Sequence, residues 1–517
     1  MEKRRINHET MISYSELSGV LFFGVLFAAK AFGLYDGQHA FRIALVIAAF
    51  FLVFHLSVTK HSLFEWGMIG FFLAFGLLVY LQSGEKGMLL YLATMVVMKG
   101  VDVRRLLKIA FFIATAGFSI LMSLSLVGIH EDFTIIHFRK GAVLRRALGY
   151  PGQNVVHSAA FVIVALFLYL YGTHFEREST TQKPHYFRVC IYSMLFNLYI
   201  YLYSVSYTGV LATTALILIW GYLHMRPSLT KAENMGINLI FPMILALSFI
   251  PFQVLQGETF EKWDRILNNR LGYPRYYFAS EPITLFGTRL QPAPSDNYYL
   301  DNAFQYAFLQ LGVVTFLMVC LFFFVQIEHA RKHQALSELS LLLGYVIIGF
   351  SDPFLFNTGY KNVGFVFLGA LFYRMAERAQ KRMPMVLQKQ IALFPKTGEE
   401  RYKPKGILEW MTGAFWRMEE TYRRKRTSAL LLAAAAFVIT YYIGAIDDGA
   451  ILSPINRDYQ ILRSLSSDIY DATQESRTAG VHFRSSISAM ITAMVLYVEG
   501  CAFLRRDKKK ESFFIEE

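Results

Sequence analysis

Residues 39–58 form an apolar run, HAFRIALVIAAFFLVFHLSV, with the length and composition of a membrane-spanning helix. Such a helix needs about 20 mostly apolar residues, and the chain offers similar runs throughout its length. We count about fourteen candidate spans by this criterion, at residues 15–34, 39–58, 64–81, 87–100, 106–127, 155–172, 188–204, 208–223, 237–255, 303–326, 338–350, 361–374, 428–446 and 485–504. The runs at 87–100 and 338–350 are short enough to be half-spans or re-entrant segments. The sequence therefore predicts an all-α fold, a polytopic bundle of transmembrane helices.

The composition also indicates a membrane protein and argues against nucleic-acid binding. Of the 517 residues, 55% are hydrophobic and only 17% are charged, whereas a soluble chain carries about a quarter charged residues. Most of the net charge of +13 falls in predicted cytoplasmic loops and in the tail around Lys508–Lys510. Topology and anionic lipid explain a charge in those places, so we expect no nucleic-acid partner. The three cysteines lie in apolar runs, which excludes a disulfide framework or a metal cluster built on them.

Lys and Arg concentrate in every second loop, and this pattern orients the chain. The first cluster is Lys3–Arg5. If each span crosses the membrane once, the basic loops near residues 60, 104–108, 177–188, 226–231 and 331–332 lie on the same side of the membrane as this cluster. Cytoplasmic loops carry this excess. We therefore expect a multi-pass protein of the cytoplasmic membrane, with a retained first span and both termini in the cytoplasm.

Two loops on the opposite side break this rule. The first, at about 128–154, carries Arg139, Lys140, Arg145 and Arg146, and the second, at about 256–302, carries Lys262, Arg265, Arg270, Arg275 and Arg289. Lys and Arg are normally depleted from outer loops. Cations kept there indicate an anionic ligand, and the planar, permanently charged guanidinium group of Arg suits phosphate best.

We divide the chain into three parts. Residues 1–375 form a membrane-embedded core, and residues 376–427 form a basic cytoplasmic linker or lipid-surface anchor. Residues 428–517 add two spans around an outer segment, 447–482, whose apolar residues recur at helical spacing and predict an amphipathic helix. The chain has no G-x-x-x-x-G-K-[ST] loop and no H-E-x-x-H motif. We therefore expect neither ATP hydrolysis nor a metal or other cofactor, and a substrate that is already activated.

In the first basic loop, Arg145 and Arg146 precede a Gly/Pro-rich turn at 149–152, directly before a predicted span. Such a turn fixes a tight path and holds both guanidinium groups at the mouth of the membrane. They suit a lipid-borne pyrophosphate. The alternative is that they bind lipid headgroups or the nearby Glu131 and Asp132.

The second basic loop interleaves arginines with aromatic, amide and acidic side chains. Ring faces with a few directed polar groups suit a sugar, and the candidates are Trp263, Arg265, Asn268, Arg270, Arg275, Tyr276 and Tyr277. An interfacial aromatic belt explains the rings without a ligand, but it explains neither the arginines nor the length of the loop. Asp301 and Asn302 open the next span. Asp301 is either a helix cap or a general base near a sugar hydroxyl.

These residues carry a resemblance to the Wzy-type polysaccharide polymerases and, more distantly, to the O-antigen ligases. Four short patches resemble the family in order: Arg145, Gly149, Tyr150 and Asn154; Leu267, Asn268, Arg270 and Leu271; Leu285, Phe286 and Gly287; and Asp301, Asn302 and Gly312, where ligases typically have His in place of Asp301. The resemblance covers about residues 1–375. Family members often have His-Pro before the Asn, where this chain has Gly152 and Gln153, so a catalytic role of that His is vacant or passes to His157.

The resemblance implies a metal-independent glycosyltransferase of the C-type superfamily, with a twelve-span core and two extra C-terminal spans. It would polymerise undecaprenyl-pyrophosphate-linked oligosaccharide repeat units into a surface polysaccharide on the outer face of a bacterial membrane. Arg145 and Arg270 would stabilise the departing pyrophosphate, and Asp301 would orient or deprotonate the acceptor hydroxyl. The substrate-binding set would be Arg146, Asn154, His157, Trp263, Arg265, Asn268, Arg275, Tyr276, Tyr277 and Asn302.

Two other functions remain open. A ligase would move the finished glycan to another acceptor. A flippase for the lipid-linked oligosaccharide would instead need cations in a central cavity and internal symmetry between halves. The partners implied are the lipid-pyrophosphate-linked oligosaccharide, membrane lipid, and a chain-length regulator or flippase.

Overall fold

The computed structural model describes residues 12–127, 129–138, 142–177, 185–226, 228–267, 269–291, 300–394, 401–402 and 434. This part of the chain is mostly helical, and eight of its helices are long and apolar enough to cross a membrane. The prediction of an all-α membrane protein is confirmed at this level. The predicted spans 428–446 and 485–504, and the amphipathic segment 447–482, lie outside the described residues.

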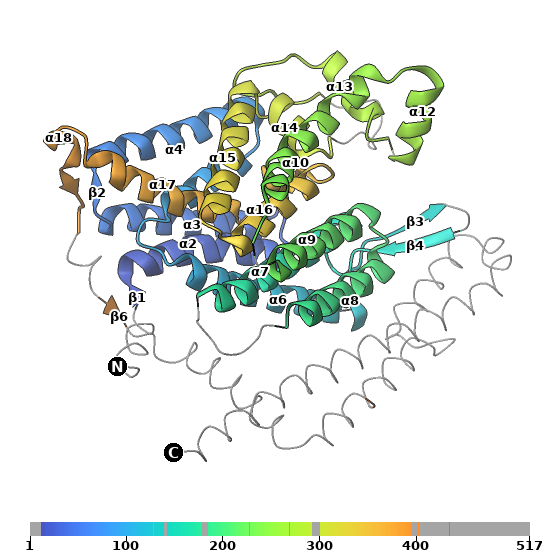
Figure 1. Ribbon diagram of the computed structural model, residues 1–517, viewed down its shortest axis with the longest axis horizontal. Helices are drawn as coiled ribbons and strands as arrows, with labels where there is room; N and C mark the ends of the chain where they lie inside the picture. Colours follow the sequence, from blue (N-terminus) through green and yellow to red (C-terminus); the bar gives the residue numbers. More distant parts are fainter. Residues whose placement is uncertain are drawn as a thin grey trace.

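Each predicted span before residue 375 coincides with a helix or a pair of helices (Figure 1). The helices are α2 Tyr14–Ala31, α3 His39–Val58, α4 Leu63–Ser83, α5 Gly87–Val96, α6 Val103–Val127, α7 Gln153–Arg177, α8 Tyr186–Ser204, α9 Tyr207–Met225, α10 Lys231–Phe249, α14 Ala303–Leu309, α15 Val313–Lys332, α16 Leu336–Gly349 and α17 Gly364–Gln380. The run predicted as one span at 303–326 is two helices, α14 and α15, because the chain bends at Gly312.

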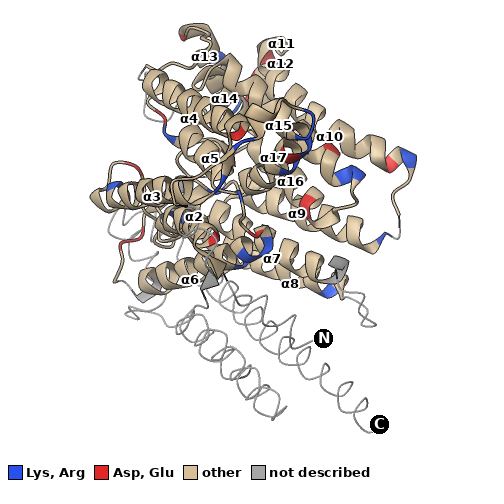
Figure 2. Ribbon diagram, turned by 90° about the vertical axis from the view of Figure 1, so that its left-hand side faces the viewer, with Lys and Arg blue, Asp and Glu red and all other residues tan. Residues whose placement is uncertain are grey.

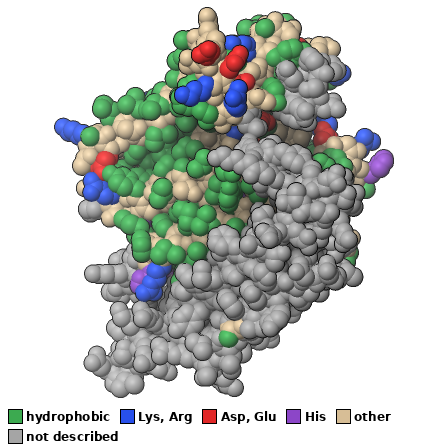
Figure 3. Space-filling model, turned by 90° about the vertical axis from the view of Figure 1, so that its right-hand side faces the viewer, with side chains coloured by type: hydrophobic (Ala, Val, Ile, Leu, Met, Phe, Trp, Pro, Cys, Tyr) green, Lys and Arg blue, Asp and Glu red, His purple; other side chains and the backbone are tan. Residues whose placement is uncertain are grey.

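The side chains that face outward are apolar, as a lipid environment requires. On α3, exposed residues such as Ile43, Val46 and Phe50 recur at helical spacing, while Ala44 and Ala48 face inward. A continuous hydrophobic patch covers much of one face of the molecule, with charged side chains at its edges (Figure 3). Charged residues are sparse along the helices and gather near their ends and in the loops (Figure 2).

Two short apolar helices lie in the interior of the bundle. Nearly every residue of α5 and α16 is buried. With 10 residues, α5 is about 15 Å long, half of the roughly 30 Å hydrocarbon layer. The short runs expected at 87–100 and 338–350 are therefore short helices, which the protein rather than lipid surrounds.

The chain after α17 returns to the core instead of leaving it. Beyond α18 (Met385–Gln388), β5 (Gln390–Ile391) pairs antiparallel with β2 (His61–Ser62), and β6 (Arg401–Tyr402) pairs with β1 (Ile12–Ser13). The sequence analysis predicts neither pairing, because two-residue strands carry no periodic signal. The boundary expected at residue 375 also falls inside α17.

The loops that break the charge rule fold into short elements at the other end of the bundle, which we call the site end. The first loop is a hairpin, β3 (Thr134–Phe138) and β4 (Ala142–Arg146). The second holds α11 (Pro251–Val254), α12 (Gly257–Ile266) and α13 (Gly272–Ser280). In Figure 1, β3, β4 and α12 lie on the right, whereas β1, β2 and α18 lie on the left.

Two of the family-like patches touch each other at the site end. Gly287 and Gly312 both take positive φ values, 97° and 94°. The backbone N–H groups of Val313 and Val314 donate to the carbonyl oxygens of Thr284 and Leu285, at 3.0 and 3.1 Å. The Leu-Phe-Gly patch is therefore docked on the bend between α14 and α15.

We expect Gly312→Ala to destabilise this junction by about 2–4 kcal/mol, because of both steric overlap and strained φ. A Cβ atom at Gly312 would lie 2.3 Å from the Gly287 backbone nitrogen and 2.5 Å from the Leu285 carbonyl oxygen. Thermal unfolding in detergent measures the effect. Gly236→Ala, on α10 with no atom within 4 Å of the added Cβ, is the control and should unfold no earlier than the wild type, because Ala is the better helix former. Equal melting temperatures for the two variants would contradict the expectation.

Candidate functional site

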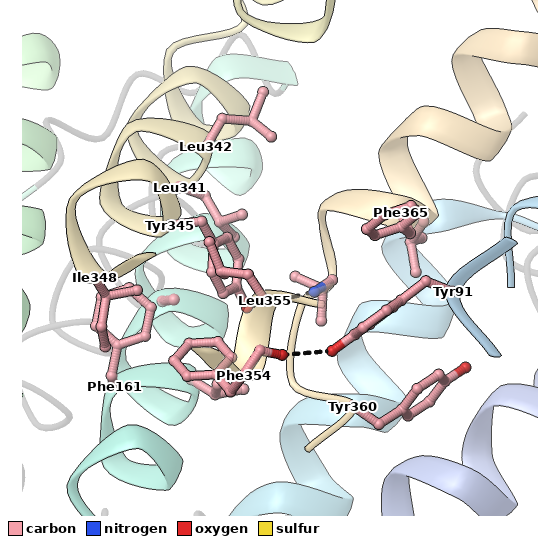
Figure 4. Close-up of a cluster of buried hydrophobic side chains, with 14 of the residues drawn as sticks. Tyr91, Phe161, Leu341, Leu342, Tyr345, Ile348, Phe354, Leu355, Tyr360 and Phe365 are labelled. Carbon is pink, nitrogen blue, oxygen red and sulfur yellow. Dashed lines mark hydrogen bonds between the residues drawn. The ribbon is translucent and has the colours of Figure 1, made fainter. Parts of the chain in front are cut away.

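The loop between α16 and α17, residues 350–363, is held rigidly at the site end by buried tyrosines (Figure 4). The Tyr91 hydroxyl donates to the Phe354 carbonyl oxygen at 2.8 Å and accepts from the Lys361 backbone N–H at 3.1 Å. The Tyr345 hydroxyl donates to the Lys361 carbonyl oxygen at 2.8 Å. Tyr360 takes a left-handed backbone conformation, with φ of 49°, which is uncommon for a bulky residue. The fold thus fixes the loop, which includes Asp352 and Lys361.

Arg270 lies in a turn between α12 and α13 that Asp264 organises. The Asp264 carboxylate accepts hydrogen bonds from the backbone N–H groups of Leu271 and Gly272, at 2.9 and 2.8 Å. Asn269 takes a left-handed conformation, with φ of 63°, which Asn tolerates better than most residues. The backbone on both sides of Arg270 is therefore fixed.

From this turn, Arg270 reaches to the start of α14 and to the 350–363 loop. Its Nη2 atom lies 3.4 Å from Asp301 Oδ2 and donates to the Ser351 carbonyl oxygen at 3.2 Å. Its Nε atom is buried and has no hydrogen-bond partner in the described part of the chain. Arg270 and Asp301 line one small pocket, with Ser248 and Gln305 among the other lining residues. A guanidinium nitrogen without an acceptor, next to a pocket, is suited to receive an anion.

Asp352 connects this pair to the first loop. Its carboxylate accepts a hydrogen bond from the Ser158 hydroxyl at 2.5 Å. Ser158 lies one turn after Asn154 on α7, and Asn154 Oδ1 accepts from Arg145 Nη2 at 3.0 Å. Arg270 reaches the same loop, since it donates to the carbonyl oxygen of Ser351, the residue before Asp352. Arg145 and Arg270 come from loops far apart in the sequence, and the structure brings them into one polar network.

Two acids of this network, and Lys361 beside it, have perturbed pKa values. Burial raises the pKa of Asp301 and of Asp352, with Arg270 opposing the change at Asp301 and Lys361 opposing it most at Asp352. Burial lowers the pKa of Lys361 to about 8, against the attraction of Asp352. Burial disfavours the charged form of each group. Perturbed titratable groups gathered in one place mark a candidate functional site.

Two residues expected to bind substrate are buried and paired within the protein. Arg146 is 1% exposed, and its Nε atom lies 2.5 Å from Asp132 Oδ2. This agrees with the alternative in which the first loop's arginines pair with nearby acids. The His157 ring is buried between the Ser204 hydroxyl at 3.1 Å and Asn197 Oδ1 at 2.8 Å. Both side chains are therefore engaged inside the fold.

Asn302 is a helix cap. Its Oδ1 atom accepts hydrogen bonds from the backbone N–H groups of Phe304 and Gln305, and its amide nitrogen donates to the Ser248 hydroxyl and the Phe350 carbonyl oxygen. The N-terminal N–H groups of a helix need such a partner. Asn302 therefore fixes α14 and leaves the neighbouring Asp301 at the pocket.

Arg275 holds the short helices of the second loop together. Its Nε atom donates to the Phe252 carbonyl oxygen at 2.9 Å, Nη2 donates to the Leu255 carbonyl oxygen, and the guanidinium lies 3.6 Å from the centre of the Phe260 ring. This use of all faces of the side chain indicates a structural role.

The remaining candidates of the second loop differ in exposure. Trp263 is 47% exposed on α12, and Arg265 is exposed on the same helix. Tyr276 is half-buried and Tyr277 is buried, with their ring centres 5.4 Å apart. Asn268 lies outside the described residues. Among the candidates that the structure describes here, the residues on α12 are the ones exposed to solvent.

The sequence analysis does not identify Ser158, Asp352 or Lys361 as site residues. Ser158 is a single hydroxyl in an apolar run, and Lys361 stands at the edge of a predicted span. Asp352 offers one usable signal, because an acidic residue before Pro353 directly after a span is unusual for a lipid-facing turn. Within the described ranges, no group of three or more His, Cys, Asp or Glu side chains is placed to hold a metal ion.

We expect Tyr91→Phe to lower both stability and any activity of this site. Loss of the hydroxyl leaves the Phe354 carbonyl and the Lys361 N–H buried without a partner, at a cost of about 1–3 kcal/mol each. Thermal unfolding and a ligand-binding assay on the same preparation measure the two effects. Tyr80→Phe is the matched control, since the Tyr80 hydroxyl has no hydrogen bond within the described residues. Unchanged unfolding of Tyr91→Phe would show that the loop does not depend on this hydroxyl.

Comparisons with protein-family models, with curated proteins and with solved structures found no match to this chain.

Proposed function

We propose that this protein is a membrane glycosyltransferase of the Wzy type, which polymerises undecaprenyl-pyrophosphate-linked oligosaccharide repeat units. The observation that carries the proposal is the polar network of Arg145, Asn154, Asp352, Arg270 and Asp301, which joins both basic loops at one end of the bundle. Cations from two loops, with a carboxylate beside them, fit a reaction that expels a pyrophosphate and activates a hydroxyl.

The chemistry assigns each group a step. The acceptor hydroxyl oxygen forms a bond to the anomeric carbon of the growing chain, and the bond from that carbon to the pyrophosphate oxygen breaks. Arg145 and Arg270 stabilise the negative charge that develops on the leaving pyrophosphate. Asp301, next to Arg270, accepts the hydroxyl proton or orients the hydroxyl. The substrate is already activated, so the step needs neither nucleotide nor ATP.

The proposal also fixes a topology. The helices from α2 to α17 form the core in a bacterial cell membrane, with the N-terminus in the cytoplasm and the site end on the outer face. The charge pattern of the loops supports this orientation. The site end carries the two basic loops, and the opposite end carries β1 and β2. A chain-length regulator or a flippase would then be a partner in the same membrane.

Release of the leaving group tests the proposal. Purified protein in detergent is incubated with one lipid-pyrophosphate-linked repeat unit and a chelator, without nucleotide. We expect one undecaprenyl pyrophosphate to appear for each new glycosidic bond. Release that requires a separate, non-lipid acceptor would identify a ligase instead, and absence of any release with a range of repeat units would refute a transferase.

A further inference from the structure

A second cationic pocket lies beside the proposed site. Helices α2, α6 and α7 pack side by side (Figure 2), and a pocket between them is lined by Lys30 and Lys361. Its other walls are mostly small and apolar, with Ala31, Ala114 and Ala159 among them. The proposed transfer reaction uses neither lysine.

Lys30 is the first unusual feature of this pocket. A lysine near the end of a span normally extends its ammonium group to the interface, but Lys30 is only 8% exposed. Its Nζ atom lies 3.7 Å from the centre of the Phe41 ring. Within the described residues no hydrogen-bond acceptor faces its ammonium group, whose protein contact is the Phe41 ring.

Lys361 is the second unusual feature of this pocket. It is also 8% exposed, and within the described residues its Nζ atom donates one hydrogen bond, to the Val155 carbonyl oxygen at 3.2 Å. The nearby Asp352 attracts its charge. Two buried ammonium groups at one pocket disfavour each other, and a buried charge is costly unless it is paired and hydrogen-bonded. An anion in the pocket would satisfy both lysines at once.

We propose that this pocket binds the phosphate group of a lipid, with Lys30 and Lys361 as its ligands. Ammonium groups act as point charges for phosphate, and the small apolar walls suit the first carbons of the attached chain. The three helices are apolar enough to cross a membrane, and in a bilayer phosphate groups belong to lipids. The lipid is a prenyl phosphate of the substrate or a bulk phospholipid. The inference goes beyond the proposed reaction, because lipid binding requires no sugar transfer.

Binding to the full chain in detergent tests the proposal, with undecaprenyl phosphate and phosphatidylglycerol as the two probes. We expect each probe that binds to raise the melting temperature, and we expect Lys30→Met and Lys361→Met to weaken its binding about tenfold or more. Without lipid, Lys30→Met should unfold no earlier than the wild type, since replacing an unpaired buried charge by an apolar side chain is often neutral or stabilising. Lys361→Met also removes the cation that faces Asp352 and should unfold earlier. Lys86→Met, at a partly exposed lysine paired with Asp36, is the control and should bind as the wild type does.

The outcomes separate the sources and the two proposals. A preference for undecaprenyl phosphate assigns the pocket to the substrate, and equal binding of both lipids assigns it to any lipid phosphate; either supports the proposal. Binding that is undiminished in the double variant, or no binding to the wild type, overturns it. Should a variant not fold, photoactivatable forms of both lipids on the wild type must label α2, α6, α7 or the 350–363 loop, and absence of any label there also overturns it. Lipid binding without sugar transfer would leave this inference intact and remove the transferase.

Discussion

Replacing Arg270 by Ala should reduce transfer by a factor of about 10²–10³ or more, the usual effect of removing one donor that stabilises a developing negative charge. Arg270 has an Nε atom without a partner in the described residues, and its Nη2 atom is shared between Asp301 and Ser351. A departing pyrophosphate would complete this arrangement. The measurement is the initial rate of transfer with the lipid-linked repeat unit.

Arg270→Lys separates charge from shape. Lysine keeps the positive charge beside Asp301, but it cannot offer two parallel N–H groups to a phosphate. We therefore expect the Lys variant to remain at least about tenfold below the wild type, although it should fold normally. Lys262→Ala, an exposed cation on α12, is the control and should keep nearly full activity. Full activity of Arg270→Lys would mean that the site needs only a point charge.

Asp301→Asn should have the second largest effect, a loss of about 10²–10⁴-fold if the carboxylate accepts the acceptor proton. The wild-type rate should then rise with pH through the pKa of Asp301, which burial raises above its ordinary value. Because 36% of the side chain is exposed, we expect a modest shift. The Asn variant should lack this acidic limb in its pH profile.

The same substitution should not destabilise the protein at neutral pH. The pKa of Asp301 is higher in the folded protein than the usual value for an unfolded chain, so the folded state binds its proton more tightly. Ionised Asp301 therefore opposes folding above the folded pKa, and this cost disappears as pH falls below the unfolded pKa. Asn cannot ionise, so its melting temperature at pH 7 should equal or exceed that of the wild type. A lower melting temperature with unchanged activity would assign Asp301 a structural role.

The sequence predicts the helices well because one physical quantity, apolar length, determines them. The runs that contain α2, α3 and α4 are recognisable without any knowledge of their neighbours. The sequence does not predict the elements of the site end. There, α12 and α13 form within the segment expected to be a long loop, and β3 pairs with β4. These elements depend on side-chain partners, such as the Asp264 carboxylate in the turn before α13, which no periodicity reveals.

The sequence likewise predicts some residues of the candidate site and misses others. The charge rule singles out Arg145 and Arg270, and the structure places both in one network. It also singles out Arg146, which pairs with Asp132 inside the fold, because a sequence pattern gives the type of a residue and not its partner. Asp352, which joins the two loops, comes from a short loop with no excess of charge.

One measurement tests the central claim, that cations of both basic loops serve a metal-independent polymerisation. Purified full-length protein receives a synthetic lipid-pyrophosphate-linked repeat unit, with a chelator and without nucleotide, and the products are separated on a gel. We predict a ladder of polymers for the wild type and for Lys262→Ala, and none for Arg145→Ala or Arg270→Ala. A wild type that makes no ladder but moves the lipid across a proteoliposome bilayer would contradict the account and identify a transporter.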